Sequence, residues 1–239
     1  MKIFHRLAGG FRVAFQGLKK LLLFITGTDT GIGKTVLAAT LVAHLRRKGL
    51  AVGALKPVCS GDREDARAIF TALDGALSLD EINPWHFQKP IAPMLAARAE
   101  KKRVKLAEVV AHARHIQKRF PLLIIEGAGG LLSPLGEDFD SRDLIKALGA
   151  LPVVVCPNRL GVVNQTLLVL AALPRGLAGK AQVVLVAQRK PDVSYEGNGR
   201  LLAEMIGRKR IHFLPWLKKG FSDPRGASAL NLLVRAAGF

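Results

Sequence analysis

The residues whose types and spacing most clearly suggest a chemical function lie between Leu21 and Thr35, where an apolar run leads into a glycine-rich turn. Residues 27–35 read Gly-Thr-Asp-Thr-Gly-Ile-Gly-Lys-Thr, and an amphipathic pattern follows them. Such a turn directs backbone N–H groups and a helix N-terminus toward one point, which favours a bound phosphate. Lys34 would place a positive charge on the β- and γ-phosphates, and the Thr35 hydroxyl would be a ligand for Mg²⁺. The pattern therefore indicates a nucleotide site.

The spacing of this turn departs by one position from the pattern G-x-x-x-x-G-K-[ST]. Counting back from Gly33, the first glycine is expected at position 28, which Thr28 occupies, while Gly27 precedes it. An ordinary glycine-rich strand–turn–helix is the competing interpretation. The apolar run before the turn and the helix pattern after it favour the nucleotide site.

The elements that must position this turn are predicted from apolar periodicity along the chain. Runs suited to buried strands cover 21–26, 51–56, 122–126, 152–156, 183–187 and 211–214. Helical patterns lie between them, over 35–48, 106–119, 141–148, 164–173 and 199–207. Strands that alternate with helices indicate one α/β domain, 21–239, with a doubly wound and mostly parallel sheet. The segment 77–93, rich in Pro and aromatic residues, is predicted to be an irregular excursion that could wall a pocket.

Polar or glycine-rich residues follow several of these strands, at the sheet edge where such folds bind ligands. Lys56, which ends a strand and precedes Pro57, would be held at that edge and could stabilise negative charge on bound phosphates. A lysine that extends from the core to solvent is the competing interpretation. Glu126 ends another strand and is a candidate Mg²⁺ ligand, and Asp65 is a second, since Mg²⁺ needs only one or two carboxylates.

The chain carries 36 Lys and Arg against 18 Asp and Glu, a formal net charge of +18. Nucleic acid is one partner that such a balance suggests. The basic residues are spread along the chain, however, and aromatic residues make up only 6% of it. This distribution favours solvated helix ends and attraction of small anions over a nucleic-acid partner.

The first 20 residues contain no acidic side chain, and their apolar residues recur at helical spacing among Lys and Arg. A membrane-surface helix or an organelle presequence is one interpretation. A disordered basic tail, or sequence translated from an upstream start, is the interpretation that we favour, because Ser is absent and Gly9-Gly10 weakens a helix.

The length and the cysteine content suit a domain that folds without a disulfide or a structural metal. A domain of 239 residues buries enough surface to fold without disulfide or metal. The two cysteines, Cys59 and Cys156, have no metal-ligand spacing and are typical of a reducing cytosol. No apolar run approaches the roughly 20 residues of a membrane span, so we expect a cytoplasmic protein.

Together these motifs resemble the dethiobiotin synthetase family, ATP-dependent enzymes of biotin biosynthesis. The resemblance covers most of residues 21–232 and is carried by five segments. They are 26–35, 56–61, 126–130, the Leu160-Gly161-x-x-Asn164 turn, and Pro215-Trp216-Leu217. The displaced first glycine is normal in this family. The resemblance implies a homodimer of doubly wound, P-loop NTPase-like subunits, with ATP and Mg²⁺ as cofactors and 7,8-diaminononanoate and CO₂ or bicarbonate as reactants.

The resemblance also implies roles for individual residues. Catalytic roles fall to Lys34, Lys56 and Thr30. The nucleotide would be bound by Gly31, Ile32, Gly33, Lys34, Thr35, Glu126, Gln188 and Pro215. The substrate would be bound by Ser60, Gly129, Gly161 and Asn164, the last two across a dimer interface. Magnesium would be held by Thr35, Asp65 and Glu126.

Three features depart from the family pattern. Gln188 stands where the family usually has an Asn that reads adenine, which leaves the base preference open. The interval from Ser60-Gly61 to Asp65 is short, so Asp65 is a less secure ligand than Glu126. The basic residues 1–20 have no counterpart in the family.

Two other functions fit a fold of this kind. A ParA/MinD-like ATPase switch that binds membrane or DNA would suit the positive charge, but that family has an additional lysine early in its phosphate loop, where this chain has Thr28-Asp29-Thr30. A cobyrinic-acid-type amidating synthetase would need a glutaminase partner or domain. Both are less favoured than the dethiobiotin synthetase.

Overall fold

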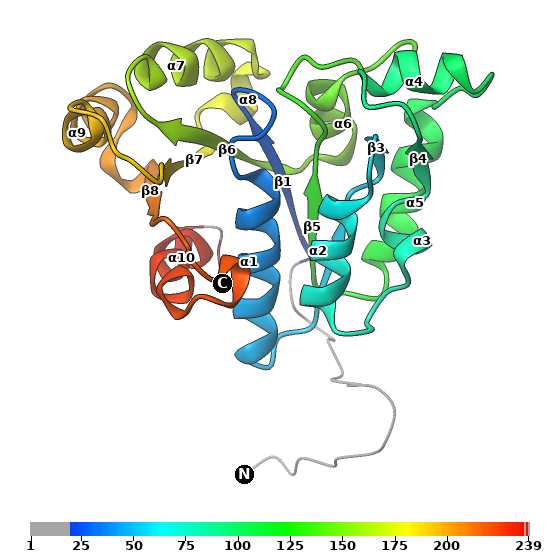
Figure 1. Ribbon diagram of the computed structural model, residues 1–239, viewed down its shortest axis with the longest axis horizontal. Coiled ribbons are helices and arrows are strands. Elements are labelled where there is room, and N and C mark those ends of the chain that lie inside the picture. Colours follow the sequence, from blue (N-terminus) through cyan, green and yellow to red (C-terminus); the bar gives the residue numbers. More distant parts are fainter. Residues whose placement is uncertain (1–19, 237, 239) are drawn as a thin grey trace.

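The computed structural model describes residues 20–236 and 238, and its centre is a parallel six-stranded sheet in the order β2-β5-β1-β6-β7-β8. Its strands are β1 (Leu21–Gly27), β2 (Val52–Leu55), β5 (Leu122–Glu126), β6 (Leu151–Asn158), β7 (Gln182–Ala187) and β8 (Ile211–Leu214). Helices lie on both faces (Figure 1). The predicted doubly wound α/β fold is confirmed.

The strands of this sheet are mostly apolar because both faces of the sheet are covered. Every residue of β2, β5 and β7 is buried. On one face lie α1 (Lys34–Arg47), α2 (Glu64–Leu73) and α10 (Pro224–Ala236), in front of the sheet in Figure 1. On the other face α5 (Leu106–Gln117) packs against α6 (Ser141–Leu148).

The sheet order brings three strand ends together. β1 lies between β5 and β6, with Ile25 paired to Glu126 and Gly27 to Val155. The turn after β1, the segment after β5 and the start of α7 (Val162–Ala172) therefore lie along one edge, the upper edge in Figure 1. The remaining helices are α3 (Leu79–Ile82), α4 (Pro93–Ala99), α8 (Arg175–Ala178) and α9 (Tyr195–Ile206), with short 3₁₀ turns η1 (Arg208–Arg210) and η2 (Gly220–Ser222).

The prediction that 77–93 is irregular is wrong in part. The segment contains α3 and β4 (Trp85–Phe87), and β4 forms a separate parallel pair with β3 (Val58–Ser60). A capping box between Ser78 and Glu81 starts α3. The buried Asn83 then donates from Nδ2 to the carbonyl oxygen of Lys56 at 2.7 Å. These contacts fix the backbone beside Lys56.

Five helices, α2, α3, α4, α8 and α10, were not predicted, and α7 begins two residues earlier than expected. Lys56 lies one residue beyond the end of β2. The prediction for residues 1–20 concerns a segment that falls, apart from Lys20, outside the described residues. Among the helices of residues 20–236, none is long and apolar enough to cross a membrane.

Candidate active site

The glycine-rich turn after β1 wraps around the N-terminus of α1. Gly31 and Gly33 have φ angles of 71° and 98°, a region that favours glycine. A Cβ on Gly33 would also lie 3.2 Å from Cγ1 of Val186, at the end of β7. The ammonium group of Lys34 is buried and donates to the carbonyl oxygen of Asp29 at 2.6 Å. The turn thus has the shape of a phosphate loop, with its lysine folded back onto the loop.

Next to this loop, four predicted side chains meet in one cluster. The Nζ atom of Lys56 lies 2.6 Å from Oε1 of Glu126 and 2.7 Å from Oδ2 of Asp65. The hydroxyl oxygen of Thr35 lies within hydrogen-bond distance of the same two carboxylates, 2.8 Å from Glu126 Oε1 and 2.6 Å from Asp65 Oδ1, and donates its single proton to one of them. Residues far apart in the sequence therefore form a single network, as predicted from their positions after the strands of a parallel sheet. Asp65 lies in the first turn of α2.

Burial gives this cluster its electrostatic character. Burial alone lowers the pKa of Lys56, but the charges of Glu126 and Asp65 outweigh it and raise that pKa above its usual value. Burial raises the pKa of Asp65, yet the ammonium of Lys56 holds it below its ordinary value. Burial raises the pKa of Glu126, against the attraction of Lys56.

Burial, and then repulsion from Lys56, lowers the pKa of Lys34 to about 8. The charges of Glu126, Asp65 and Asp29 raise this pKa, but they do not outweigh the opposing effects. Lys34 and Lys56 therefore act on each other electrostatically in one site.

The donor set suits a small hard cation. In the part of the chain that is described, no group of three or more His, Cys, Asp or Glu side chains could hold a metal ion. Mg²⁺ does not require one, because it keeps several waters and takes one or two carboxylates together with phosphate oxygens. Glu126 Oε2 is buried and makes no hydrogen bond, although Oε1 has two donors. A free carboxylate oxygen beside the hydroxyl of Thr35 fits a magnesium ligand set.

Of two further predicted residues, Gly129 lies close to the loop, and the contact described for Ser60 is with another segment. Gly129 has a φ of 67°, and a Cβ there would clash with the side chain of Ser133 and lie 3.8 Å from Oγ1 of Thr30. This places the segment after β5 against the phosphate loop. Ser60 lies at the end of β3, and its hydroxyl donates to the carbonyl oxygen of Ile91 at 2.5 Å.

A cavity of about 490 Å³ opens between the phosphate loop and α7. Its lining includes Thr28 and Asp29 from the loop, Leu132 and Ser133 from the segment after β5, and Leu168 from α7. Asn164 precedes Leu168 by one turn of α7, and Gly161, with a φ of 88°, is the N-cap of that helix. The predicted substrate residues on α7 therefore lie on the same rim as the phosphate loop.

Gln188 and Pro215 follow the ends of β7 and β8. The amide nitrogen of Gln188 donates to the carbonyl oxygen of Val186 at 3.1 Å. Since Val186 also packs against Gly33, the segment that carries Gln188 leaves the sheet beside the phosphate loop. The described contacts connect neither residue directly with the carboxylate cluster.

Sequence reasoning missed an amide network that orders the turn before α7. The buried Asn158 donates to the carbonyl oxygen of Tyr195 at 3.0 Å, and Asn198 donates to Oδ1 of Asn158 at 2.9 Å. Asp192 accepts from the backbone N–H of Leu160 at 2.8 Å. The only signal in the sequence was an Asn at the end of an apolar strand, and its partners Tyr195 and Asn198 lie 37 and 40 residues away.

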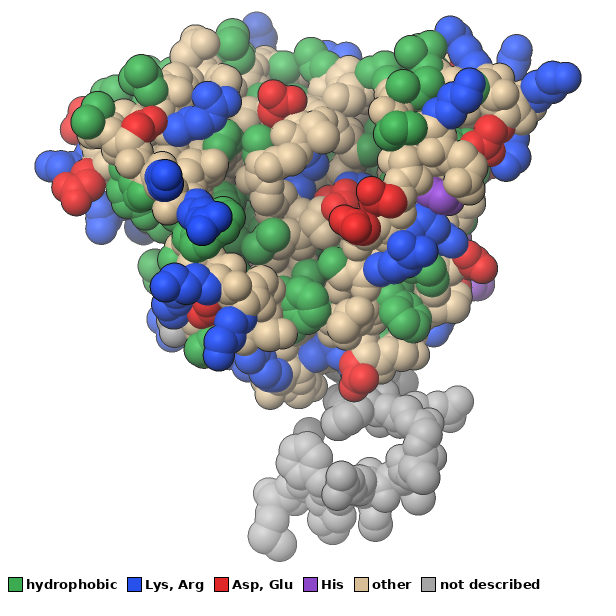
Figure 2. Space-filling view, viewed as in Figure 1, with side chains coloured by type: hydrophobic (Ala, Val, Ile, Leu, Met, Phe, Trp, Pro, Cys, Tyr) green, Lys and Arg blue, Asp and Glu red, His purple; other side chains and the backbone are tan. Residues whose placement is uncertain are grey.

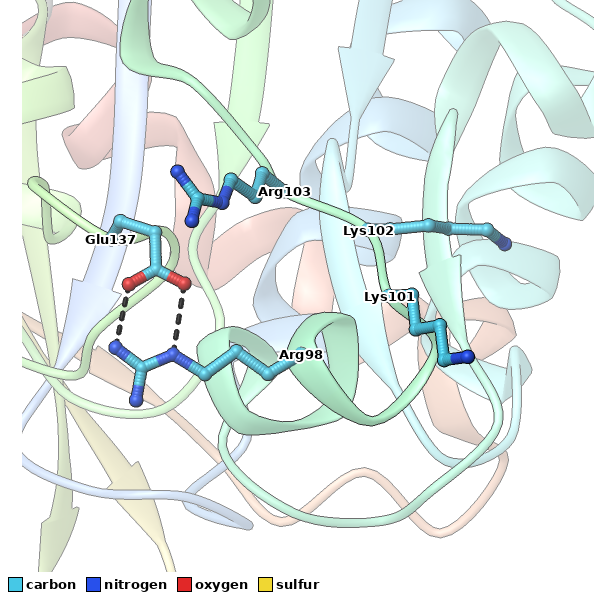
Figure 3. A pocket seen from close by; sticks show the side chains of 5 residues that line it. All are labelled: Arg98, Lys101, Lys102, Arg103 and Glu137. Atoms are coloured by element: carbon cyan, nitrogen blue, oxygen red, sulfur yellow. Dashed lines mark hydrogen bonds and ion pairs between the residues drawn. The ribbon is translucent and has the colours of Figure 1, made fainter.

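A second hollow, of about 450 Å³, lies near the end of α4. Arg98 forms two hydrogen bonds with the carboxylate of Glu137, at 2.9 and 2.6 Å. Figure 3 shows Lys101 and Lys102 pointing away from this pair, so the basic side chains diverge. The arrangement supports the interpretation of 101–103 as solvated charge.

The distribution of charge on the rest of the visible surface agrees with solvated, dispersed basic side chains. Figure 2 shows Lys and Arg side chains scattered over the face that carries α1, α2 and α10. A group of acidic side chains lies where α2 begins, close to Asp65. Within the described part, the high positive charge is therefore not gathered into one patch on this face.

The comparisons with known proteins fit this site. A family model described as an AAA domain matches residues 22–220. An ATP-dependent dethiobiotin synthetase from Anaeromyxobacter sp. (strain Fw109-5) is 41% identical over 194 residues, covering 79% of this chain and 87% of the relative. One from Bacillus licheniformis is 34% identical over 201 residues, covering 82% and 86%.

Solved structures show the fold alone. The MinC:MinD cell division protein complex of Aquifex aeolicus matches with a TM-score of 0.56 at 13% identity, over 91% of this chain and 93% of that chain. A ParA family ATPase from Chlorobium tepidum matches with a TM-score of 0.52 at 14% identity, over 92% and 94%. At such identity only the fold is shared, and neither a site nor a partner is implied. The level of identity with the curated relatives decides the family: this chain belongs to the ATP-dependent dethiobiotin synthetases.

Proposed function

We propose that this chain joins CO₂ to 7,8-diaminononanoate and closes the ureido ring, forming dethiobiotin, ADP and phosphate from ATP. Family membership supports the reaction class. The observation that carries the proposal is the position of Lys56, which is buried in the same site as Lys34 and bonded to Asp65 and Glu126.

The reaction needs three bond-forming steps. One amine of the substrate attacks CO₂ and loses a proton, which gives a carbamate. A carbamate oxygen then attacks the γ-phosphorus, and ADP leaves. The second amine attacks the carbonyl carbon of the mixed anhydride, and phosphate is expelled as the five-membered ring closes.

The carbamate and the triphosphate are both anions, so their approach requires cations and oriented donors. Lys34 and Lys56 would supply two ammonium groups for the carbamate and the transferring phosphoryl group. Thr30 and Ser60 would donate hydrogen bonds near them. No covalent nucleophile is required, which agrees with burial raising the pKa of Cys59 to about 11 and that of Cys156 to about 12.

Thr35, Asp65 and Glu126 would hold Mg²⁺, and the ion would neutralise phosphate charge when it is bound with the nucleotide. The backbone N–H groups of 31–35 would surround the phosphates. Gln188 and Pro215 would lie against the base. The side chain of Gln188 is one methylene longer than that of the Asn usual in the family, so the preferred base is to be measured.

We further propose that the protein acts as a homodimer through the surface around α7. Three leucines are exposed there: Leu132 by 53%, Leu160 by 74% and Leu168 by 62%. Pairing this surface with a second copy would cover them. It would also place Gly161 and Asn164 where they receive the carboxylate of a substrate bound in the partner, with Gly129 near the reacting end.

The test is phosphate release by the purified protein. We expect release from ATP only when 7,8-diaminononanoate and bicarbonate are both present. Turnover that ignores the diamine and is stimulated by DNA or liposomes would overturn the proposal and favour a ParA/MinD-like switch.

A further inference from the structure

The ammonium of Lys56 occupies the point where the acidic side chains of the site converge. Its three N–H donors are matched by three oxygens: Glu126 Oε1 at 2.6 Å, Asp65 Oδ2 at 2.7 Å and Gly127 O at 3.2 Å. Lys56 is 2% exposed and Glu126 is fully buried. The group therefore sits in an oxygen cage of the kind that a hard cation uses.

Two cations, the ammonium group of Lys56 and Mg²⁺, could be bound by these oxygens. Asp65 and Glu126 are the carboxylates that the proposed function assigns to Mg²⁺, and the hydroxyl of Thr35 lies within hydrogen-bond distance of both. Lys56 and Mg²⁺ repel each other strongly at such short range in a buried site. Binding of both cations to the two carboxylates at these distances is therefore unfavourable.

We propose that Lys56 is the resident cation of the nucleotide-free protein and withholds Asp65 and Glu126 from Mg²⁺ until a nucleotide binds. The proposal rests on the proposed function for the identity of the metal site. Phosphate oxygens offer Lys56 another anionic partner. When Lys56 turns to them, the carboxylates become free for the metal, so metal binding is conditional on nucleotide.

Two features of the cage support exchange rather than a permanent ion pair. Glu126 Oε2 is buried without a hydrogen-bond donor, which leaves a coordination position that Lys56 does not use. The side chain of Asp65 is 48% exposed, so the cage is open on one side. A structural ion pair would be expected to satisfy the buried carboxylate fully.

The test measures metal binding without nucleotide or substrate. Mn²⁺ replaces Mg²⁺, and the electron paramagnetic resonance signal of free Mn²⁺ reports the bound fraction. We expect weak binding to the unaltered protein. In Lys56→Met, which keeps the length of the side chain and removes its charge, we expect Mn²⁺ affinity to rise at least ten-fold. Mg²⁺ should also raise the melting temperature of Lys56→Met and leave that of the unaltered protein unchanged.

Matched variants locate the effect. Lys180→Met removes an exposed lysine near the amino end of β7, at the opposite edge of the sheet, and should gain no affinity. The double variant Lys56→Met/Glu126→Gln should lose the gain. Lys56→Gln, which retains hydrogen-bond donors, takes the place of Lys56→Met if circular dichroism shows that the latter is unfolded.

Tight Mn²⁺ binding by the unaltered protein, or no gain on removal of the Lys56 charge in a folded variant, would overturn the proposal. These readouts are independent of catalysis. If the unaltered protein forms no dethiobiotin while Lys56→Met gains Mn²⁺ affinity, the proposed reaction alone is rejected. Normal product formation without that gain would reject the cation exchange alone.

Discussion

The affinity of the protein for nucleotide should fall as the pH rises above 8. In the free protein, burial and then the repulsion of Lys56 lower the pKa of Lys34 to about 8. Bound phosphates stabilise the ammonium form and raise that pKa. Between the two values, binding must take up a proton, so a higher pH opposes it. At pH 9, one unit above the free pKa, about one molecule in eleven is protonated, and affinity should be roughly ten-fold weaker than at neutral pH.

Isothermal titration with a non-hydrolysable ATP analogue at pH 7.5, 8, 8.5 and 9 measures this loss. The phosphates are already ionised in that range, because their last pKa is about 6. Lys34→Met should bind weakly at every pH and lose the dependence, while circular dichroism confirms that both proteins remain folded at pH 9. An affinity that stays constant from pH 7.5 to 9 would refute the assignment of a buried, charge-repelled Lys34.

The remaining predictions concern a glycine, the second lysine and the first 20 residues. In a urea titration, the free energy of unfolding of Gly33→Ala should be about 1–3 kcal/mol lower than that of the unaltered protein, because the φ of Gly33 is 98° and Val186 limits the space. The variant should also lose most of its nucleotide affinity. An unchanged midpoint of unfolding would contradict this prediction. Lys56→Ala should abolish ring closure and cost about 3–5 kcal/mol of stability, since it leaves Glu126 buried without its partner. Nucleotide binding should remain largely intact, and normal turnover would remove Lys56 from the mechanism. Deletion of residues 1–20 should leave phosphate release unchanged, and a loss of activity would show that these residues contribute.

The central sheet was predictable because its strands are buried on both faces and read as continuous apolar runs. All six strands were located, and β5 and β8 were bounded correctly. The pair formed by β3 and β4 was missed because each strand has only three residues and their pairing is non-local. The helix α2 was not predicted because its acidic start is equally typical of a loop and of a helix start, and α10 follows the last strand, where no alternation remained to indicate it.

The cluster of Lys56, Asp65, Glu126 and Thr35 was predicted from one physical rule: parallel strands end at the same edge of a sheet. The rule names the residues that meet, but it does not say which atoms bond. The contact of Lys56 with both carboxylates, and the free Oε2 of Glu126, depend on side-chain packing that no local pattern records. The amide network of Asn158 and Asn198 was hidden for the same reason.

The fate of the carbon in ¹³C-bicarbonate tests the central claim most directly. We expect incubation with ATP, Mg²⁺ and 7,8-diaminononanoate to place the label in the ureido carbonyl of dethiobiotin, detected by mass spectrometry, with one ADP formed for each labelled product. ADP formation at the same rate with no labelled ring would contradict the account.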